Sequence, residues 1–194
     1  MDKLTRDDLM SLEAYSQARD DFKAQVMAHK RDRRLALGTN ATLYFEDRMT
    51  MLYQVQEMLR IERIFEAEGI ADELAAYNPL IPDGSNWKAT FMVEFPDIDE
   101  RRAMLRQLIG LENAVYLQVQ GHEKIRPIAD EDLERSDGDK TSAVHFLRFE
   151  LTDEMIAALK SGANLDAGID HPNYQVTVSP VAEPIRLALL GDLS

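Results

Sequence analysis

The most apolar helical pattern in the chain runs from Met49 to Pro82, and polar residues interrupt its apolar face. On a helical wheel of about 100° per residue, one arc collects the apolar side chains Met51, Val55, Met58, Leu59 and Phe65. Glu62 falls at the centre of that arc, and Glu66 lies one turn further along. The pattern therefore predicts a long, central, largely covered helix with carboxylates on its buried face.

The exit from this helix is the segment Tyr77-Asn78-Pro79-Leu80-Ile81-Pro82. Because Asn78 precedes a proline, it is pushed out of the helical region, so the helix should end firmly there after fraying near Gly69. Two arginines are left for the rims of the helix or for ion pairs. We therefore expect structural roles for Asn78, Pro79, Pro82, Arg60 and Arg63.

Before the long helix, apolar residues recur at helical spacing from Leu12 to Val26, which predicts a surface helix that ends near Arg31. The basic run His29 to Arg34 is then the solvated end of that helix, where cations also suit the helix dipole. Alternating residues on both sides of Gly38-Thr39-Asn40 predict a β-hairpin between Arg33 and Phe45.

From Trp87 onward every second residue is apolar, which is the pattern of a β-strand. The rest of the chain contains two strand–helix–strand units, Phe91 to His122 and Leu147 to His171. In tandem they give a β-α-β-β-α-β order, as in ferredoxin-like folds, with an antiparallel sheet and both helices on one face. The predicted class is α+β: N-terminal helices, a β-hairpin and a long central helix packed on this sheet. We expect one domain over residues 1–194, with a helical arm and hairpin in 1–82 and the sheet portion in 87–194.

The net charge and the cysteine content exclude several classes of function. The 22 basic residues against 35 acidic ones give a net charge of −13, which repels nucleic-acid phosphates and anionic lipid heads. No run approaches the ~18 apolar residues of a membrane span, so we expect a cytoplasmic protein. With 0 cysteines there is no thiolate metal site and no iron–sulfur cluster of its own, so redox work would need a borrowed cofactor.

A buried carboxylate must be paired, protonated or bound to a metal. For Glu62 and Glu66 the first reading is an ion pair with an arginine, either Arg60 or Arg63 or one from the basic run. The second reading is a site for iron, manganese or zinc, or a general base. A di-iron bundle is excluded because it needs Glu-x-x-His motifs, and none of the 4 histidines has a glutamate three residues before it.

The histidines offer further candidates. His145 shares its strand face with apolar residues and should point inward, either as a hydrogen-bonded core residue or as an acid–base group. In a ferredoxin-like sheet, His122 and His171 end at the same rim, roughly 14 Å apart, which is too far for one metal. The densest cluster of side chains of the metal-ligand type is Asp166, Asp170 and His171. The residues around this cluster are also those that favour a tight turn. The acidic segment from Ile128 to Asp139 is expected to be a solvated loop.

The stretch Tyr53 to Arg63 together with Tyr77 to Pro82 resembles the hallmark of an uncharacterised family of bacterial proteins, catalogued as a domain of unknown function. The resemblance covers the whole chain. Members are often encoded beside a rubrerythrin-like protein and a cysteine-rich iron–sulfur protein, which implies a part in peroxide defence or electron transfer. It supplies no catalytic residues and no cofactor.

Two hypotheses follow. The first is a non-enzymatic accessory module that docks on redox partners, with the long helix as its scaffold. The second is a metal- or cofactor-binding enzyme that uses Glu62 and Glu66 with a histidine. Because ferredoxin-like sheets often pair, a homodimer is also expected by analogy with that fold.

Overall fold

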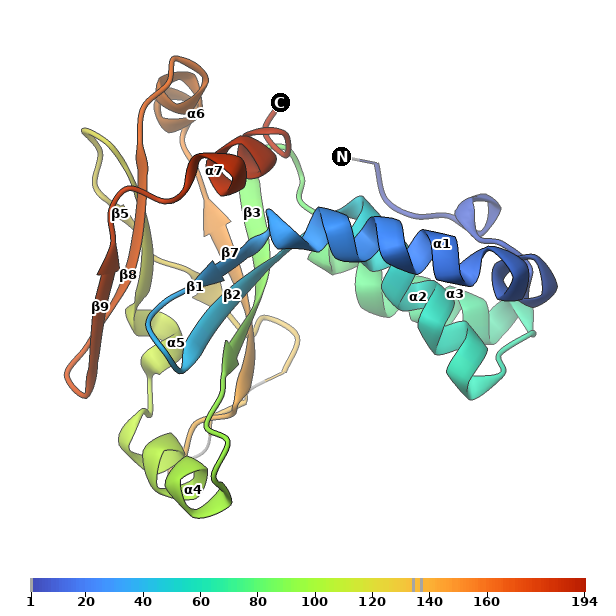
Figure 1. The fold of residues 1–194 in the computed structure, drawn as a ribbon, viewed down its shortest axis with the longest axis horizontal. Coiled ribbons are helices and arrows are strands. Elements are labelled where there is room, and N and C mark those ends of the chain that lie inside the picture. Colours follow the sequence, from blue (N-terminus) through green and yellow to red (C-terminus); the bar gives the residue numbers. More distant parts are fainter. Residues whose placement is uncertain (1, 134, 137) are drawn as a thin grey trace.

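The computed structural model describes residues 2–133, 135–136 and 138–194. Figure 1 shows two parts: a helical arm, and a pair of β-sheets that face each other. The two parts have separate hydrophobic cores. No helix in the described ranges has both the length and the apolar character that crossing a membrane requires.

The arm contains three α-helices and two short 3-10 helices. In chain order they are η1 (Arg6–Asp8), α1 (Leu12–Arg31), α2 (Arg48–Glu62), α3 (Ala67–Tyr77) and η2 (Asn78–Leu80). Side-chain caps fix where α1 and α2 begin: the Ser11 hydroxyl accepts from the Ala14 amide, and Asp47 and Thr50 form a capping box. The core of the arm includes Leu4, Met51, Val55, Leu59 and Ile81, all buried.

The long helix is broken where the sequence predicted continuity. Helix α2 ends at Glu62 because Arg63 adopts the left-handed conformation, with φ 56°. The Ile64 amide then donates to the Leu59 carbonyl at 3.0 Å, which closes a Schellman-type end. Helix α3 folds back and packs on α2, and Gly69, where we expected fraying, lies inside α3. Helix α3 ends at Tyr77, close to the predicted exit, but Asn78 keeps helical dihedral angles (φ −55°, ψ −35°) and begins the 3-10 helix η2, so it is not pushed out of the helical region.

Two antiparallel sheets form the other part. The first has the order β1-β2-β3-β7-β6, with β1 (Arg34–Ala36), β2 (Ala41–Glu46), β3 (Asn86–Val93), β7 (Val144–Glu150) and β6 (Ile128–Ala129). The second has the order β5-β4-β8-β9, with β5 (Lys124–Ile125), β4 (Val115–Val119), β8 (Leu165–His171) and β9 (Tyr174–Val178). The predicted hairpin is confirmed as β1 and β2, and it forms the edge of the first sheet.

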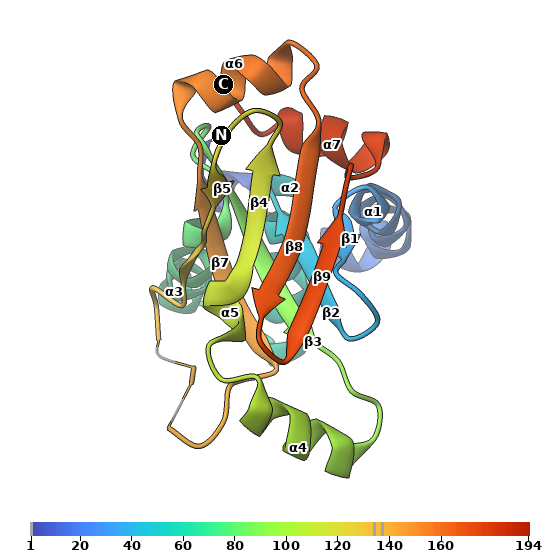
Figure 2. The same cartoon turned by 90° about the vertical axis from the view of Figure 1, so that its left-hand side faces the viewer.

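The sheets pack face to face, as Figure 2 shows with β4 and β8 lying in front of the first sheet. Their shared core takes buried side chains from both, among them Phe45, Trp87, Phe91, Phe149, Val115, Leu117 and Ile169. Helices α4 (Ile98–Gln107) and α6 (Asp153–Lys160) lie at opposite ends of this sandwich. The short helices α5 (Leu111–Ala114) and α7 (Glu183–Leu190) complete it.

This arrangement confirms the α+β class and corrects the ferredoxin-like plan. The two strand–helix–strand units exist, but β3 pairs with β7 in the first sheet and β4 pairs with β8 in the second. Each unit therefore crosses from one sheet to the other. The physical reason is coverage: α4 buries none of its residues and α6 buries only Ile156 and Leu159, so these helices cannot cover a sheet face. The two sheets cover each other instead.

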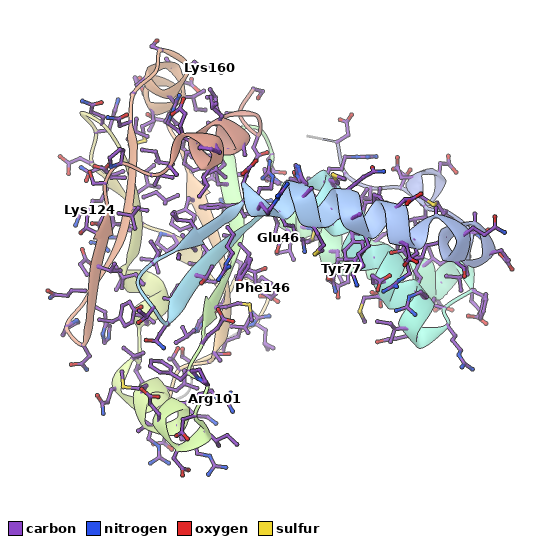
Figure 3. All side chains as sticks on the ribbon, viewed as in Figure 1. Glu46, Tyr77, Arg101, Lys124, Phe146 and Lys160 are labelled. Atoms are coloured by element: carbon purple, nitrogen blue, oxygen red, sulfur yellow. The ribbon has the colours of Figure 1, made fainter. Side chains whose placement is uncertain are left out.

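The arm joins the sandwich through a buried charge cluster at the end of the basic run. Arg33, 4% exposed, donates to both carboxylate oxygens of Asp192 at 2.9 and 2.6 Å and lies 2.9 Å from Asp47. His29 contacts the same Asp47 at 2.5 Å. In Figure 3, the neighbouring Glu46 lies at this junction. The prediction of a solvated run is thus wrong for Arg33, because its guanidinium is needed by buried carboxylates.

Candidate functional site

The carboxylates expected on the buried face of the long helix are on the surface. Glu62 and Glu66 are both exposed, and Phe65 is 62% exposed. Glu62 is the last residue of α2, beyond the buried Leu59, where the core of the arm ends. Arg63 then turns the chain and shifts Phe65 and Glu66 out of phase with the helical wheel, which assumed one continuous helix. The buried carboxylate site of Glu62 and Glu66 is therefore not formed.

The paired carboxylate of this helix is Glu57, which links α2 to α1. Its oxygens accept from the Tyr15 hydroxyl at 2.7 Å and from Arg19 at 2.8 and 2.9 Å, and Arg60 adds bonds of 3.3 and 3.2 Å. The Arg19 guanidinium is the largest cause that lowers the pKa of Glu57 to about 2. The arginine ion pair that was predicted for Glu62 and Glu66 is thus formed by Glu57 instead, with Arg19 and Arg60.

The residues at the exit of α3 hold the N-terminus. The Asn78 side chain accepts from the Leu4 amide at 2.7 Å and donates to the Leu4 carbonyl at 2.9 Å. Pro82 is buried, while Pro79 is exposed within η2. The structural role of Arg63 comes from its left-handed backbone conformation, which ends α2, and not from an ion pair of its side chain.

The histidines at the ends of the second sheet lie far apart. Because β4 and β8 are antiparallel, with Val119 opposite Leu165, His122 and His171 lie at opposite ends of the sheet and not at one rim. His171 Nε2 donates to the Ile109 carbonyl at 3.1 Å, and its Nδ1 accepts from the Asn173 amide at 3.2 Å. His171 is therefore a structural histidine at the end of β8, beside the turn to β9.

The predicted cluster around Asp170 is an ion-pair site on the surface. Asp170 binds Arg126 at 2.5 Å and Lys124 at 3.2 Å, and the Arg126 guanidinium lowers the pKa of Asp170 to about 2. Asp166 lies opposite Gln118, four residues from Asp170 along the same strand. Within the ranges that the structure describes, no three His, Cys, Asp or Glu side chains are placed to hold a metal ion.

His145 is buried, with 0% exposure, and lies opposite Phe91 in the first sheet, so the inward orientation predicted from alternation is confirmed. Its Nδ1 lies 2.6 Å from Asp130 Oδ2, and its Nε2 lies 2.9 Å from the Thr141 hydroxyl. The Ser142 carbonyl is 3.1 Å from the same Nε2. Both ring nitrogens therefore have a fixed partner.

Two further side chains extend this contact to the surface. The Ser136 hydroxyl is 3.0 Å from the Thr141 hydroxyl, and Glu112 accepts from both of them at 3.3 Å. We call Glu112, Asp130, Ser136, Thr141 and His145 the His145 cluster. A pocket of about 220 Å³ adjoins it and is lined by Glu112, Asn113, Ala129, Asp130, Arg135 and Ser136.

The partners of His145 could not be found from the sequence. Asp130 precedes His145 by 15 residues and belongs to the acidic segment that was predicted to be a solvated loop. The structure fixes it there with a φ of 52° and with a 3.0 Å bond from the Phe146 amide to its Oδ1. Asn and Asp tolerate this left-handed conformation better than most residues, which is the one local signal at this position.

The far end of the arm is a second candidate surface. Ile61 and Phe65 are 60% and 62% exposed at the α2–α3 turn. Next to them is a pocket of about 280 Å³ whose apolar lining comes from Leu9, Met10, Leu12, Leu59, Ile64, Phe65 and Ile70. We call Ile61, Phe65 and this pocket the arm tip.

The fold and these sites define an α+β protein in which a sandwich of two antiparallel sheets carries a three-helix arm. The chain belongs to the family described as "Protein of unknown function (DUF3501)", whose model matches residues 3–193. It is similar to a novel protein of unknown function from Burkholderia pseudomallei K96243, known from a crystal structure at 1.90 Å resolution. The two chains are 49% identical over 100% of each, with a TM-score of 0.94. Among curated proteins, no sequence matches this chain.

Proposed function

We propose that this protein is a cytoplasmic docking module that binds a redox partner through the arm tip. The observation that carries the proposal is the exposure of Ile61 and Phe65, at 60% and 62%, beside an apolar pocket. Large apolar side chains that gather beside a pocket are typical of protein interaction sites. Neither side chain is needed to fill the core of the arm, since Leu59 and its neighbours already do so.

Charge at the arm tip is mixed. Glu62, Glu66 and Glu68 are exposed around the α2–α3 turn together with Arg63, and Arg6 lines the pocket. A complementary surface would present an apolar side chain to the pocket and charges of both signs to its rim. The net charge of −13 on the whole chain favours a basic partner at longer range.

The class of partner comes from the family resemblance, which implies a rubrerythrin-like protein and a cysteine-rich iron–sulfur protein. Because this chain has 0 cysteines, it contributes no cluster of its own to electron transfer. In the proposed role it holds or orients a partner that carries the redox centre.

Binding measurements with the two partner proteins test this function. The full chain is immobilised, and the affinity for each partner is measured by biolayer interferometry up to micromolar concentration. Replacing Phe65 or Ile61 with serine should weaken the Kd by about tenfold or more, because each buried apolar side chain contributes roughly 1.5–3 kcal/mol. Leu187→Ser is the matched control, since Leu187 is 51% exposed on α7 in the sandwich.

Two results would contradict the proposal: no binding to either partner, or equal weakening by the arm-tip variants and the Leu187 control. A second copy of this chain is the competing occupant of the arm tip. Light scattering that shows a dimer, dissociated by Phe65→Ser, would assign the surface to self-association instead.

A further inference from the structure

The His145 cluster lies on the sandwich and has no part in the docking function. Its hydrogen bonds show how many protons the buried ring of His145 carries. The Asp130 carboxylate accepts from the Phe146 amide at 3.0 Å and from Arg135 at 3.4 Å, so it is held as an acceptor. It lies 2.6 Å from Nδ1 of His145, and this nitrogen therefore carries a hydrogen.

The other ring nitrogen, Nε2, also faces acceptors. The Ser142 carbonyl, 3.1 Å away, can only accept, so Nε2 must carry a hydrogen as well. The Thr141 hydroxyl, 2.9 Å from Nε2, accepts from the same N–H because it donates its own proton to Glu112 Oε2 at 3.3 Å. A ring with a hydrogen on both nitrogens is the positively charged imidazolium.

Two carboxylates surround this charge. Asp130 contacts Nδ1, Glu112 Oε2 lies 3.9 Å from Nε2, and their side chains are only 10% and 8% exposed. Arg135 also contacts Asp130, at 3.4 Å, but shares its charge with a carboxylate outside the cluster, at 2.6 Å. Phe91 of β3, whose ring centroid is 6.4 Å from that of His145, brings no charge. A neutral His145 would thus leave buried carboxylates without their cation, which is costly.

We propose that His145 is a pH-sensitive latch, whose imidazolium form fastens both ends of the β6–β7 connection to the first sheet and to α5. Asp130 follows β6, Thr141 and Ser142 precede β7, and Glu112 belongs to α5. When Nε2 loses its hydrogen, this nitrogen and the Ser142 carbonyl become two acceptors that face each other, and the charge between the carboxylates is gone. The pocket of about 220 Å³ is lined from both α5 and the connection, so release of the connection widens it.

The direction of the pH dependence follows from the proton count. A histidine in an opened, solvated connection titrates near pH 6.5, whereas the latch keeps both ring hydrogens of His145 while it is closed. The stabilisation by the latch is therefore complete below about pH 6.5 and is lost as the pH rises. Opening that releases one proton becomes more favourable by up to about tenfold for each pH unit.

Nuclear magnetic resonance of the ¹⁵N-labelled full chain tests the charge state directly. A long-range ¹H–¹⁵N correlation at pH 7 should show both ring nitrogens of His145 with the chemical shift of a protonated nitrogen. A neutral ring would show one protonated and one unprotonated nitrogen. The signals are assigned to His145 by their loss in the His145→Gln variant. The chain is measured alone, so the outcome is independent of partner binding.

Hydrogen exchange tests the release. The Thr141 amide donates to the Leu105 carbonyl and the Phe146 amide to Asp130, both at 3.0 Å, so both amides report on the closed connection. After correction for the intrinsic exchange rate, their protection in the wild type should fall by about tenfold or more between pH 6.5 and pH 8.5. His145→Gln carries no titrating ring, and its protection should not change with pH.

His122→Gln is the matched control, because His122 lies outside the cluster, after β4, and this variant should keep the wild-type pH dependence. Fluorescence of Trp87, which is 1% exposed in the sandwich core, shows whether each variant is folded. Three results would overturn the proposal: an unprotonated ring nitrogen of His145 at pH 7, protection that does not change with pH in the wild type, or the same pH dependence in folded His145→Gln.

Discussion

Replacing Glu57 with glutamine should weaken the packing of α1 on α2 in a way that depends on pH. The Arg19 guanidinium and the Tyr15 hydroxyl hold the Glu57 carboxylate, and together they lower its pKa from 4.5 to about 2. A difference of this size corresponds to about 3 kcal/mol in favour of the folded state. Because the folded pKa is the lower one, this contribution is complete above pH 4.5 and is lost as the pH falls toward 2.

Urea unfolding followed by circular dichroism at 222 nm, at pH 7 and again at pH 3, measures this contribution. The difference between wild type and Glu57→Gln should be about 3 kcal/mol at pH 7 and roughly 1.5 kcal/mol at pH 3, since the unfolded carboxylate is then mostly protonated. Glu62→Gln is the control on the same helix, and its exposed side chain should give a difference near zero at both pH values. A difference for Glu57→Gln that does not change with pH would refute the reasoning.

Three other substitutions test the backbone and the junction by the same unfolding measurement. Arg63→Gly should stabilise the arm by about 0.5–1 kcal/mol, because glycine adopts a φ of 56° without strain; a loss of stability would contradict that. Gly168→Ala should destabilise by about 1–3 kcal/mol, because the added Cβ would lie 2.4 Å from a backbone oxygen and 2.5 Å from the Tyr116 hydroxyl. Arg33→Met should cost about 3–5 kcal/mol by leaving Asp192 buried and unpaired, and adding Asp192→Leu should recover most of it; no recovery would refute the pairing.

The sequence predicts local structure well where one period continues without a break. The alternation around His145 places the residue inside the sandwich, and the change of period at Trp87 marks the start of the sheet portion. The helical wheel fails at Arg63 because the left-handed end of a helix is usually marked by glycine, and an arginine there gives no such signal. Phe65 and Glu66 were therefore placed on a buried face that ends with α2, and Glu62 lies at the very end of that helix.

Pairing between strands is a non-local property, and it limits the prediction of both fold and site. The pattern of a strand shows which face is apolar, but not whether another sheet or a helix covers it. For this reason the strand–helix–strand units were found while their distribution over two sheets was not. The same limit applies to the His145 cluster, whose members come from α5, from β7 and from the connection between β6 and β7.

The junction between arm and sandwich bears on the docking function. Arg33, Asp47 and Asp192 join the end of α1, the start of α2 and the C-terminal residues in one buried cluster. An arm fixed in this way presents its tip without an ordering cost on binding, which favours affinity. Exposed Ile61 and Phe65 do not contribute to this fixation, because they lie at the opposite end of α2. Their apolar character therefore plays no part in fixing the arm, and it is the property on which the proposed docking function rests.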